Sequence, residues 1–519
     1  MSIYLNTSVP LRNFMNLQNS KYYVDKSNII DKLNEIINTE NCYVCITKPR
    51  RFGKSSIINM LGAYYTKDLD SKEIFDKLEI SKSSAYKENL NKYNVINISF
   101  NKIPDNMKCY DDYINMIKIS LTRDIEEKYS YINSKNYFSI ADMLEDTKEQ
   151  FIFIIDEWDY IFSHNLFKEN HQDFLEFIRN LLKDRSYVAL CYMTGVLPIK
   201  KYSTGSSLNM FDEYTFLKDR LYAKYFGFTK EEVIELCNKN KEIDYKELEE
   251  WYNGYTTPSG IKLYNPRSVV IALRNGYCEN YWTSTGAMDE VLYYLKYNIA
   301  DVRNDVIEMV SGNSIDIIID EEYRAGQAEP RTREEIYSAM IIYGFLSYYE
   351  GRIKVPNKEL MKEFEKSLKD ESFGEVMNIV KKSENTLKAT LKKDSNIVAK
   401  AIDEIHNSEI PILQYNDENS LSCVITLAYL SARNYYRIER EEKSGKGYAD
   451  FMFHPKRKGD TAFVLELKVD NTPENAIKQI KEKEYYQKFI KENIDRKILA
   501  VAICYDKISK KHKCKIEEI

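Results

Sequence analysis

Several features of other protein classes are scarce in this sequence. It has only five histidines in 519 residues and neither an H-E-x-x-H motif nor paired C-x-x-C motifs, so a zinc site is not expected. The nine cysteines are scattered, and the one close pair, Cys42 and Cys45, lies in an apolar stretch typical of a strand. Residues three apart on a strand point to opposite faces, so we expect buried thiols in a reducing compartment rather than shared metal ligands.

Long apolar runs and a strong charge of one sign are also missing. The longest runs, such as "FIFII" before Asp156, fall far short of the roughly 18 residues of a membrane helix, so no membrane partner is expected. The first residues lack a basic segment followed by an apolar core, so we expect no secretory signal and a cytoplasmic protein. With 75 Lys and Arg against 80 Asp and Glu, the net charge of the chain is small and indicates no particular binding partner.

The chain is long enough for two to four domains. Apolar strands near residues 42–47, 94–100, 151–156 and 186–195 alternate with helical segments, which predicts an α/β fold with a mostly parallel sheet covered on both faces. We expect four parts: a first α/β domain at 1–225, a helical or winged-helix-like lid at 226–300, a helical connector at 301–410, and a second α/β domain at 411–519.

The stretch "TKPRRFGKSS" at residues 47–56 follows an apolar strand and opens a helical segment. It ends like a phosphate-binding loop: Gly53 allows an unusual backbone conformation, Lys54 supplies charge, and the Ser55 hydroxyl can bind Mg²⁺. Ser56 and Arg51 complete the expected nucleotide contacts. Lys48, however, stands where the first glycine of G-x-x-x-x-G-K-[ST] belongs, which leaves slow or conditional hydrolysis open.

Two acidic residues end the strand "FIFIIDE", at the edge where open α/β sheets bind ligands. We expect Asp156 to hold Mg²⁺ through water and Glu157 to polarise the attacking water. The alternative is an acidic strand end that pairs with a lysine. Thr194 is a candidate γ-phosphate sensor, with a simple strand cap as its alternative, and Arg220 is a weaker candidate for charge stabilisation.

A second constellation lies near the end of the sequence, where Asp450 precedes Glu466 and Lys468 in "VLELKV". Strand alternation puts Glu466 and Lys468 on one face. Two carboxylates can hold Mg²⁺ against a scissile phosphate, and the lysine can orient water or stabilise the transition state. Gln479 on the next helical segment and, less securely, Glu418 upstream extend the set. The alternative is a buried ion-pair network in a binding module that does not cut.

A family resemblance becomes specific when the motifs are taken in order. The segments "YYVDKSNII", "ITKPRRFGKSS", "IIDEWDY", "MTGVLPIKK", "KYFGFTKEEV", "WYNGY" and "LYNPRSVV" follow one another much as in the bacterial AAA-ATPase-like family. Members of that family usually carry a P-R-R-F-G-K-[ST] loop, so the absent glycine resembles a family feature. The order of Asp450, Glu466, Lys468 and Gln479 resembles PD-(D/E)XK nucleases, a domain to which this family is commonly fused.

The resemblance implies an ATP-binding hydrolase coupled to a nuclease, with ATP and Mg²⁺ as cofactors. It implies nucleic acid as partner, DNA ahead of RNA, and leaves a homo-oligomer open. One alternative is a nucleotide-regulated module that grips nucleic acid or protein through an inactive nuclease fold. A further alternative is an ATP-driven remodeller with a structural tail.

Overall fold

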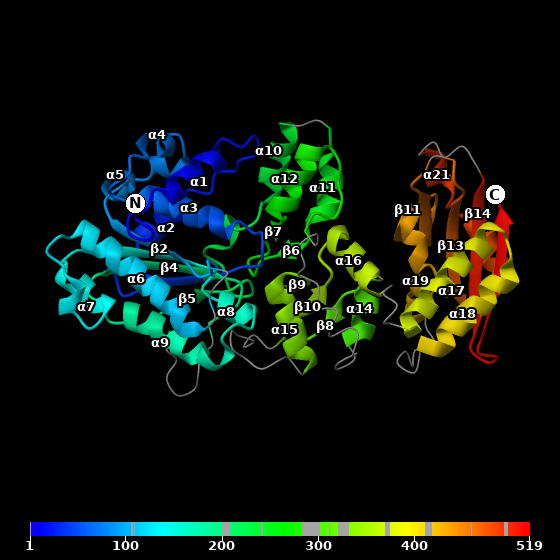
Figure 1. Ribbon diagram of the computed structural model, residues 1–519. Coiled ribbons are helices and arrows are strands. Elements are labelled where there is room, and N and C mark those ends of the chain that lie inside the picture. Colours follow the sequence, from blue (N-terminus) through cyan, green and yellow to red (C-terminus); the bar gives the residue numbers. More distant parts are fainter. Residues whose placement is uncertain are drawn as a thin grey trace. The chain divides into compact units, whose positions relative to one another are not determined.

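The computed structural model describes residues 2–104, 107, 109–199, 208–239, 242–282, 302–310, 312–319, 332–368, 374–409, 418–457, 459–491 and 497–519. The chain divides into two compact units (Figure 1). Unit 1 comprises Met1–Val291 and Ser314–Glu363, and unit 2 comprises Leu292–Asn313 and Phe364–Ile519. The expected division into four domains stays a prediction.

Unit 1 is built on a five-stranded parallel sheet of order β2-β3-β4-β1-β5. Its strands are β1 (Tyr43–Thr47), β2 (Asn94–Ser99), β3 (Phe151–Asp156), β4 (Val188–Gly195) and β5 (Asp212–Tyr214). Every residue of β3 and β4 is buried, because helices cover both faces of a parallel sheet. This confirms the α/β fold with a parallel N-terminal sheet.

Helices lie on both sides of this sheet. Figure 1 shows α6 (Tyr110–Lys128) and α9 (His171–Leu182) on one side and α1 (Val9–Gln18) and α3 (Lys54–Tyr65) on the other. Alternate β3 side chains, Phe151, Phe153 and Ile155, join the core under α6 and α9. Shorter helices complete this part: α2 (Ile29–Asn34), α4 (Lys72–Phe75), α5 (Tyr86–Asn89), α7 (Ile140–Asp146) and α8 (Tyr160–Ser163).

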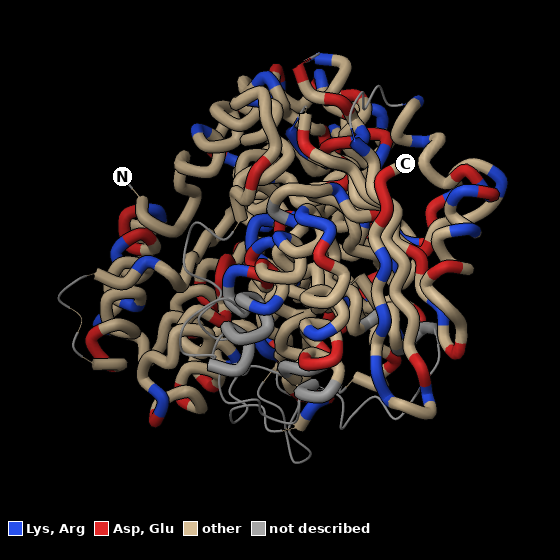
Figure 2. The backbone as a smooth tube through the Cα atoms, turned by 90° about the vertical axis from the view of Figure 1, so that its right-hand side faces the viewer, with Lys and Arg blue, Asp and Glu red and all other residues tan. Residues whose placement is uncertain are grey.

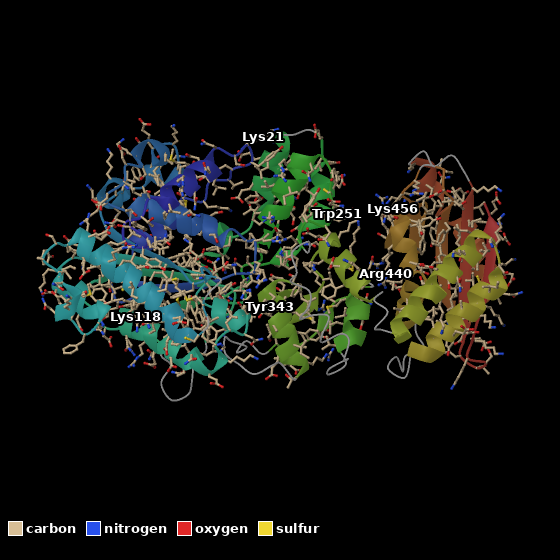
Figure 3. The ribbon with its side chains drawn as sticks, in the orientation of Figure 1. Lys21, Lys118, Trp251, Tyr343, Arg440 and Lys456 are labelled. Carbon is tan, nitrogen blue, oxygen red and sulfur yellow. The ribbon has the colours of Figure 1, made fainter. Side chains whose placement is uncertain are left out.

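Unit 1 contains a second, smaller core to which three helices contribute, and a two-stranded hairpin lies between two of these helices in the chain. These elements are α10 (Lys230–Asn238), α11 (Tyr245–Tyr252), α12 (Pro266–Asn275), β6 (Tyr255–Thr256) and β7 (Lys262–Leu263). Trp251 of α11 is labelled in Figure 3 and receives the ammonium groups of Lys358 and Lys362 over its ring, at 5.0 and 4.1 Å from the centroid. Both lysines belong to α16 (Lys358–Leu368), so cation–π contacts fix this helix to the smaller core.

The stretch expected to be a helical connector also contains strands. After α15 (Arg333–Tyr343), the strands β9 (Ser347–Tyr349) and β10 (Arg352–Lys354) form a hairpin, and β8 (Ile315–Asp316) pairs with β10. The turn residues Glu350 and Gly351 both have positive φ, 49° and 79°, as tight hairpin turns require. The expectation of a mostly helical segment missed this short turn signal.

Unit 2 contains a mixed five-stranded sheet of order β11-β12-β13-β14-β15. Its strands are β11 (Tyr436–Ser444), β12 (Gly447–Pro455), β13 (Ala462–Val469), β14 (Ile498–Asp506) and β15 (Lys511–Glu518), and only β13 and β14 are parallel. One face carries a core with α17 (Gly374–Leu391), α18 (Ser395–Glu409) and α19 (Glu418–Ala428), and the other packs on α20 (Pro473–Glu482) and α21 (Gln487–Lys491). Among the described residues, this unit also includes α14 (Val302–Val310) and the last residues of α16.

Charges of both signs are interspersed along both units, and β15 carries lysines followed by glutamates (Figure 2). Among the described residues, no helix is long and apolar enough to cross a membrane.

Candidate functional sites

The phosphate-binding loop connects β1 to α3. Gly53 precedes α3 with φ at 92°; a Cβ there would meet no neighbour within 4 Å, so the position needs glycine for its backbone conformation and not for space. The buried Lys54 ammonium turns back and donates to the carbonyl oxygens of Lys48 and Pro49, each at 2.8 Å. The loop thus closes around the lysine that the motif predicts.

The residues of the predicted magnesium site lie close together. Ser55 Oγ donates to Asp156 Oδ2 at 3.0 Å, and the Glu157 backbone N–H donates to Asp156 Oδ1 at 3.0 Å. Burial raises the pKa of Asp156 to about 6, although the hydrogen bond from Ser55 opposes the shift. Burial likewise lowers the pKa of Lys54 to about 8, against the nearby carboxylates Asp159, Asp156 and Glu157. A hydroxyl beside a carboxylate next to a phosphate loop is the donor set that suits Mg²⁺.

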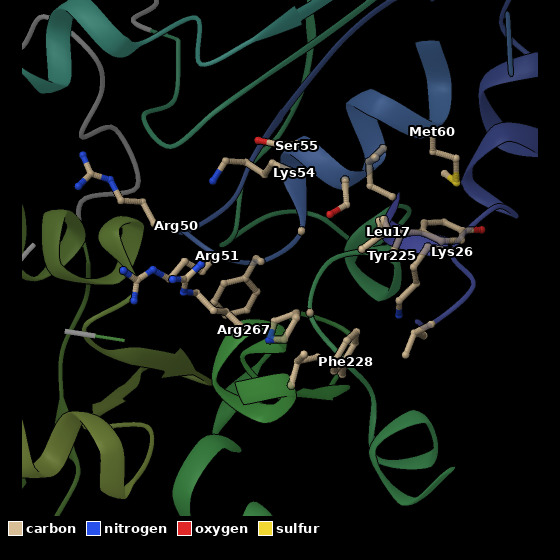
Figure 4. A pocket seen from close by; sticks show the side chains of 18 of the residues that line it. Leu17, Lys26, Arg50, Arg51, Lys54, Ser55, Met60, Tyr225, Phe228 and Arg267 are labelled. Atoms are coloured by element: carbon tan, nitrogen blue, oxygen red, sulfur yellow. The ribbon is translucent and has the colours of Figure 1, made fainter. Parts of the chain in front are cut away.

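A cavity of 840 Å³ opens beside the loop, within the size range of ligand pockets. In Figure 4, Arg50, Arg51 and Arg267 lie on one side of Lys54, whereas Leu17, Met60, Tyr225 and Phe228 lie on the other. The pocket therefore has a part lined by arginines and a largely apolar, aromatic part that also holds Lys26, whose ammonium lies 2.6 Å from Glu232 Oε1. Other lining residues are Phe14, Tyr22, Tyr23, Gly53, Ser55, Ser56, Glu157, Asp159, Ile271 and Arg274.

Three sequence candidates also contact other parts of unit 1, and of these only Arg51 lines the cavity beside Lys54. Arg51 Nη1 donates to the backbone oxygens of Tyr281, at 3.0 Å, and Trp282, so its guanidinium ties the loop to a distant segment. Thr194 is buried inside the sheet and donates its hydroxyl to Ile46 O at 2.7 Å, which fits the strand-cap alternative. Arg220 is exposed and lines a separate cavity of 380 Å³ with Phe216 and Tyr348.

Two residues of this site, Arg267 and Asp159, were not predicted from the sequence. Arg267 lies in the first turn of α12, after Asn265 caps the helix by accepting from Ser268 N at 3.2 Å; the motif "YNPRS" carries the signal, because Asn-Pro marks a helix start. Asp159 is fully buried near Lys54, and its Oδ2 accepts from Val196 N at 3.1 Å and Leu197 N at 2.8 Å. Asp159 thereby holds the segment that follows β4.

Lys48, at the place of the missing glycine, forms a buried ion pair. Its ammonium lies 2.7 Å from Asp219 Oδ2, with side-chain exposures of 2% and 0%. The neighbouring Phe52 packs edge-on against Phe216 and Tyr255, and its carbonyl accepts from Gly227 N at 3.1 Å. Lys48 and Phe52 therefore anchor the loop to the part of unit 1 beyond β5.

In unit 2 the predicted nuclease residues come together at one end of β12 and β13. Asp450 Oδ2 accepts from Leu467 N at 2.7 Å. Glu466 Oε1 accepts from Lys468 Nζ at 3.0 Å and from Gln479 Nε2 of α20. Gln479 also donates to the Tyr485 hydroxyl at 3.2 Å. The Glu418 side chain, at the start of α19, lies outside the described residues.

Glu466 is the strongest electrostatic feature of this site. It is 1% exposed, and within the described ranges its Oε2 atom has no hydrogen-bond partner. Burial, together with the charge of Asp450, raises the pKa of Glu466 to about 7, although Lys468 opposes the shift. A buried carboxylate oxygen without a partner costs free energy, and a divalent cation held with Asp450 would satisfy it. The residues present therefore fit a metal ion.

Comparisons with known proteins agree with this geometry. Residues 8–204 match the family of predicted AAA-ATPases, and residues 416–515 match the PD-(D/E)XK nuclease superfamily. The chain thus joins an AAA-like ATPase domain to a domain of the PD-(D/E)XK nuclease superfamily.

Among solved structures, the chain is similar to the Walker-type ATPase of Pyrococcus abyssi, with 14% identity and a TM-score of 0.33 over 65% of this chain and 94% of that one. No curated protein matches the chain.

Proposed function

We propose that this chain is a nucleotide-controlled, metal-dependent nuclease. In this proposal unit 1 binds and hydrolyses ATP with Mg²⁺, and unit 2 cleaves phosphodiester bonds in nucleic acid, with DNA preferred to RNA. The observation that carries the proposal is Glu466, a buried carboxylate with one unpartnered oxygen beside Asp450, Lys468 and Gln479.

The ATP half of the proposal rests on the loop and the cavity beside it. Lys54 and the backbone N–H groups at the start of α3 would bind the phosphates, and Ser55 with Asp156 would hold Mg²⁺, which neutralises phosphate charge. Glu157 would orient the attacking water, and Arg267 would add positive charge from α12. The apolar part of the cavity, with Tyr225 and Phe228, suits a base and sugar.

The nuclease half assigns a separate task to each side chain. Asp450 and Glu466 would hold a divalent ion, which lowers the pKa of bound water and screens the scissile phosphate. Lys468 would stabilise the charge that develops on the phosphate oxygens. Gln479 would keep the Glu466 carboxylate in place through its hydrogen bond.

Two assays test the two halves separately. ATP binding and phosphate release are measured for the wild type, Lys54→Ala and the exposed control Lys87→Ala; we expect loss only in Lys54→Ala. Labelled single- and double-stranded DNA and RNA are then incubated with Mg²⁺ or Mn²⁺ and the wild type, Glu466→Gln or the exposed control Glu474→Gln. Cleavage by the wild type and Glu474→Gln, and none by Glu466→Gln, supports the nuclease.

A non-cutting binding module is the second candidate, and one observation favours it. Lys468 already neutralises Glu466 within the site, as it would in a structural ion pair. In that case no nucleic acid is cut under any condition, whereas Lys468→Ala changes nucleic-acid affinity and leaves ATP binding unaltered.

A further inference from the structure

A second group of metal-type ligands lies in unit 2, on β11 and β12. Ligand atoms of Glu439, Glu442 and His454 all lie within 4.8 Å of one another. His454 Nε2 is 3.0 Å from Glu442 Oε2 and 4.0 Å from Glu439 Oε2. His454 follows Asp450 by four residues on β12, which is about 13 Å along a strand, whereas Glu442 pairs with Ala449, next to Asp450. The group therefore has its own ligand atoms but adjoins the candidate nuclease site.

The backbone of β11 explains how the two glutamates meet. Residues three apart on a regular strand point to opposite faces, and Glu439 and Glu442 are three apart. Between them, Glu441 has φ at 46°, a left-handed conformation that is uncommon for a residue with a side chain. The resulting break in alternation brings Glu442 to the side of the sheet that carries Glu439.

The group is buried, and an ammonium group lies against its carboxylates. The side chains of His454 and Glu442 are 4% and 8% exposed. The Lys488 ammonium of α21 forms an ion pair with Glu442 Oε1 and lies 3.4 Å from Glu439 Oε2. A cation is therefore already drawn to the point where the three ligands converge.

We propose that Glu439, Glu442 and His454 form a binding site for a divalent transition-metal ion, which the Lys488 ammonium replaces in the metal-free chain. Two carboxylates and an imidazole are the donor set of Zn²⁺, Co²⁺ and Mn²⁺, whereas Mg²⁺ prefers oxygen ligands alone. Lys488 is 34% exposed, so its flexible chain can turn to solvent when a metal ion enters.

The site is connected to the candidate nuclease residues through α21. Phe489, next to Lys488, packs edge-on against His454 with ring centroids 4.8 Å apart. Tyr485, three residues before Lys488, accepts a hydrogen bond from Gln479, which also donates to Glu466. Replacement of the Lys488 ammonium by a metal ion thus acts on α21. This helix begins two residues after Tyr485, which is the hydrogen-bond partner of Gln479.

Co²⁺ binding to the full-length chain tests this assignment. Binding is followed by calorimetry and by visible absorption, in an excess of Mg²⁺ that occupies the all-oxygen site. We expect one Co²⁺ per chain in the wild type and unchanged binding in Asp450→Asn. Glu442→Gln and His454→Gln should each weaken binding by about tenfold or more, and Lys488→Met should tighten it by about tenfold, because the competing cation is gone.

Two results would overturn the proposal. One is Co²⁺ binding that is lost in Asp450→Asn and retained in His454→Gln, since the ion would then occupy the nuclease site. The other is the same Co²⁺ affinity, or none, in the wild type and Lys488→Met. The comparison of the wild type with Lys488→Met tests the proposed site even if the buried variants fail to fold, because Lys488 is partly exposed. Circular dichroism checks the fold of each variant.

Discussion

The ammonium of Lys48 lies 2.7 Å from the carboxylate of Asp219, and both side chains are almost completely withdrawn from water. Burial lowers the pKa of Lys48, and Asp219 opposes that shift. Asp219 also accepts from Tyr222 N at 2.7 Å. The residue that replaces the expected glycine therefore fastens the start of the phosphate loop to the segment after β5.

Removal of one member of this pair should be costly. Lys48→Met leaves Asp219 buried without its counter-charge, so we expect the free energy of unfolding to fall by about 3–5 kcal/mol. The double variant Lys48→Met/Asp219→Leu should recover most of that loss. Lys67→Met, which breaks the more exposed pair with Glu149, serves as the control and should cost less than about 1 kcal/mol. Urea unfolding compares the wild type with these three variants; equal losses for Lys48→Met and Lys67→Met would refute the interpretation.

ATP binding should take up a proton at mildly alkaline pH. The pKa of Lys54 is lowered to about 8 by burial, so near that pH much of the lysine is neutral, and the phosphates should raise its pKa again. Calorimetry at about pH 8.5 in buffers of different ionisation enthalpy should show uptake, which should vanish near pH 6. Lys54→Arg, which stays charged, should show none at either pH. Equal uptake in Lys54→Arg would assign the proton elsewhere.

Glu466 should make the metal-free protein less stable at high pH. Its folded pKa of about 7 exceeds that of an unfolded glutamate, so the penalty is present above pH 7 and is relieved as the pH falls toward about 4.3. With chelator present, Glu466→Gln should exceed the wild type in unfolding free energy by up to about 3 kcal/mol at pH 8, and this advantage should disappear below about pH 5. The exposed Glu474→Gln serves as the matched control. A difference that is constant across pH would contradict the assignment.

Substitution of two glycines in the ATPase domain should destabilise the protein for different reasons. Gly195→Ala places a Cβ 2.3 Å from Asp159 Oδ1 and 2.7 Å from Trp158 Cδ1, so we expect about 1–3 kcal/mol of destabilisation from overpacking. Gly53→Ala meets open space but must keep φ at 92°, at a cost of about 1–2 kcal/mol. Adding Asp159→Asn to either variant should not restore its stability. Thermal unfolding with and without ATP distinguishes the two variants, because only Gly53→Ala should change the phosphate loop directly and so reduce the stabilisation by ATP. Equal stabilisation of both variants by ATP would be evidence against this distinction.

Local patterns predicted many of the side chains that lie together at both candidate sites. The strand-loop-helix around Lys54, the acidic end of β3 and the Glu466–Lys468 strand depend on neighbouring residues, so their spacing in the sequence was sufficient. The Lys48–Asp219 pair depends on residues far apart in the sequence, and no local pattern indicates it. The convergence of Glu439 and Glu442 depends on the left-handed conformation of Glu441, which no residue type in that stretch signals.

Control of the nuclease by ATP is tested by the rate of nucleic-acid cleavage with and without ATP, in the wild type, Lys54→Ala and Glu466→Gln. We expect that ATP changes the rate in the wild type, that Lys54→Ala cleaves at a rate independent of ATP, and that Glu466→Gln does not cleave. Cleavage that survives in Glu466→Gln, or an ATP effect of equal size in the wild type and Lys54→Ala, would contradict it.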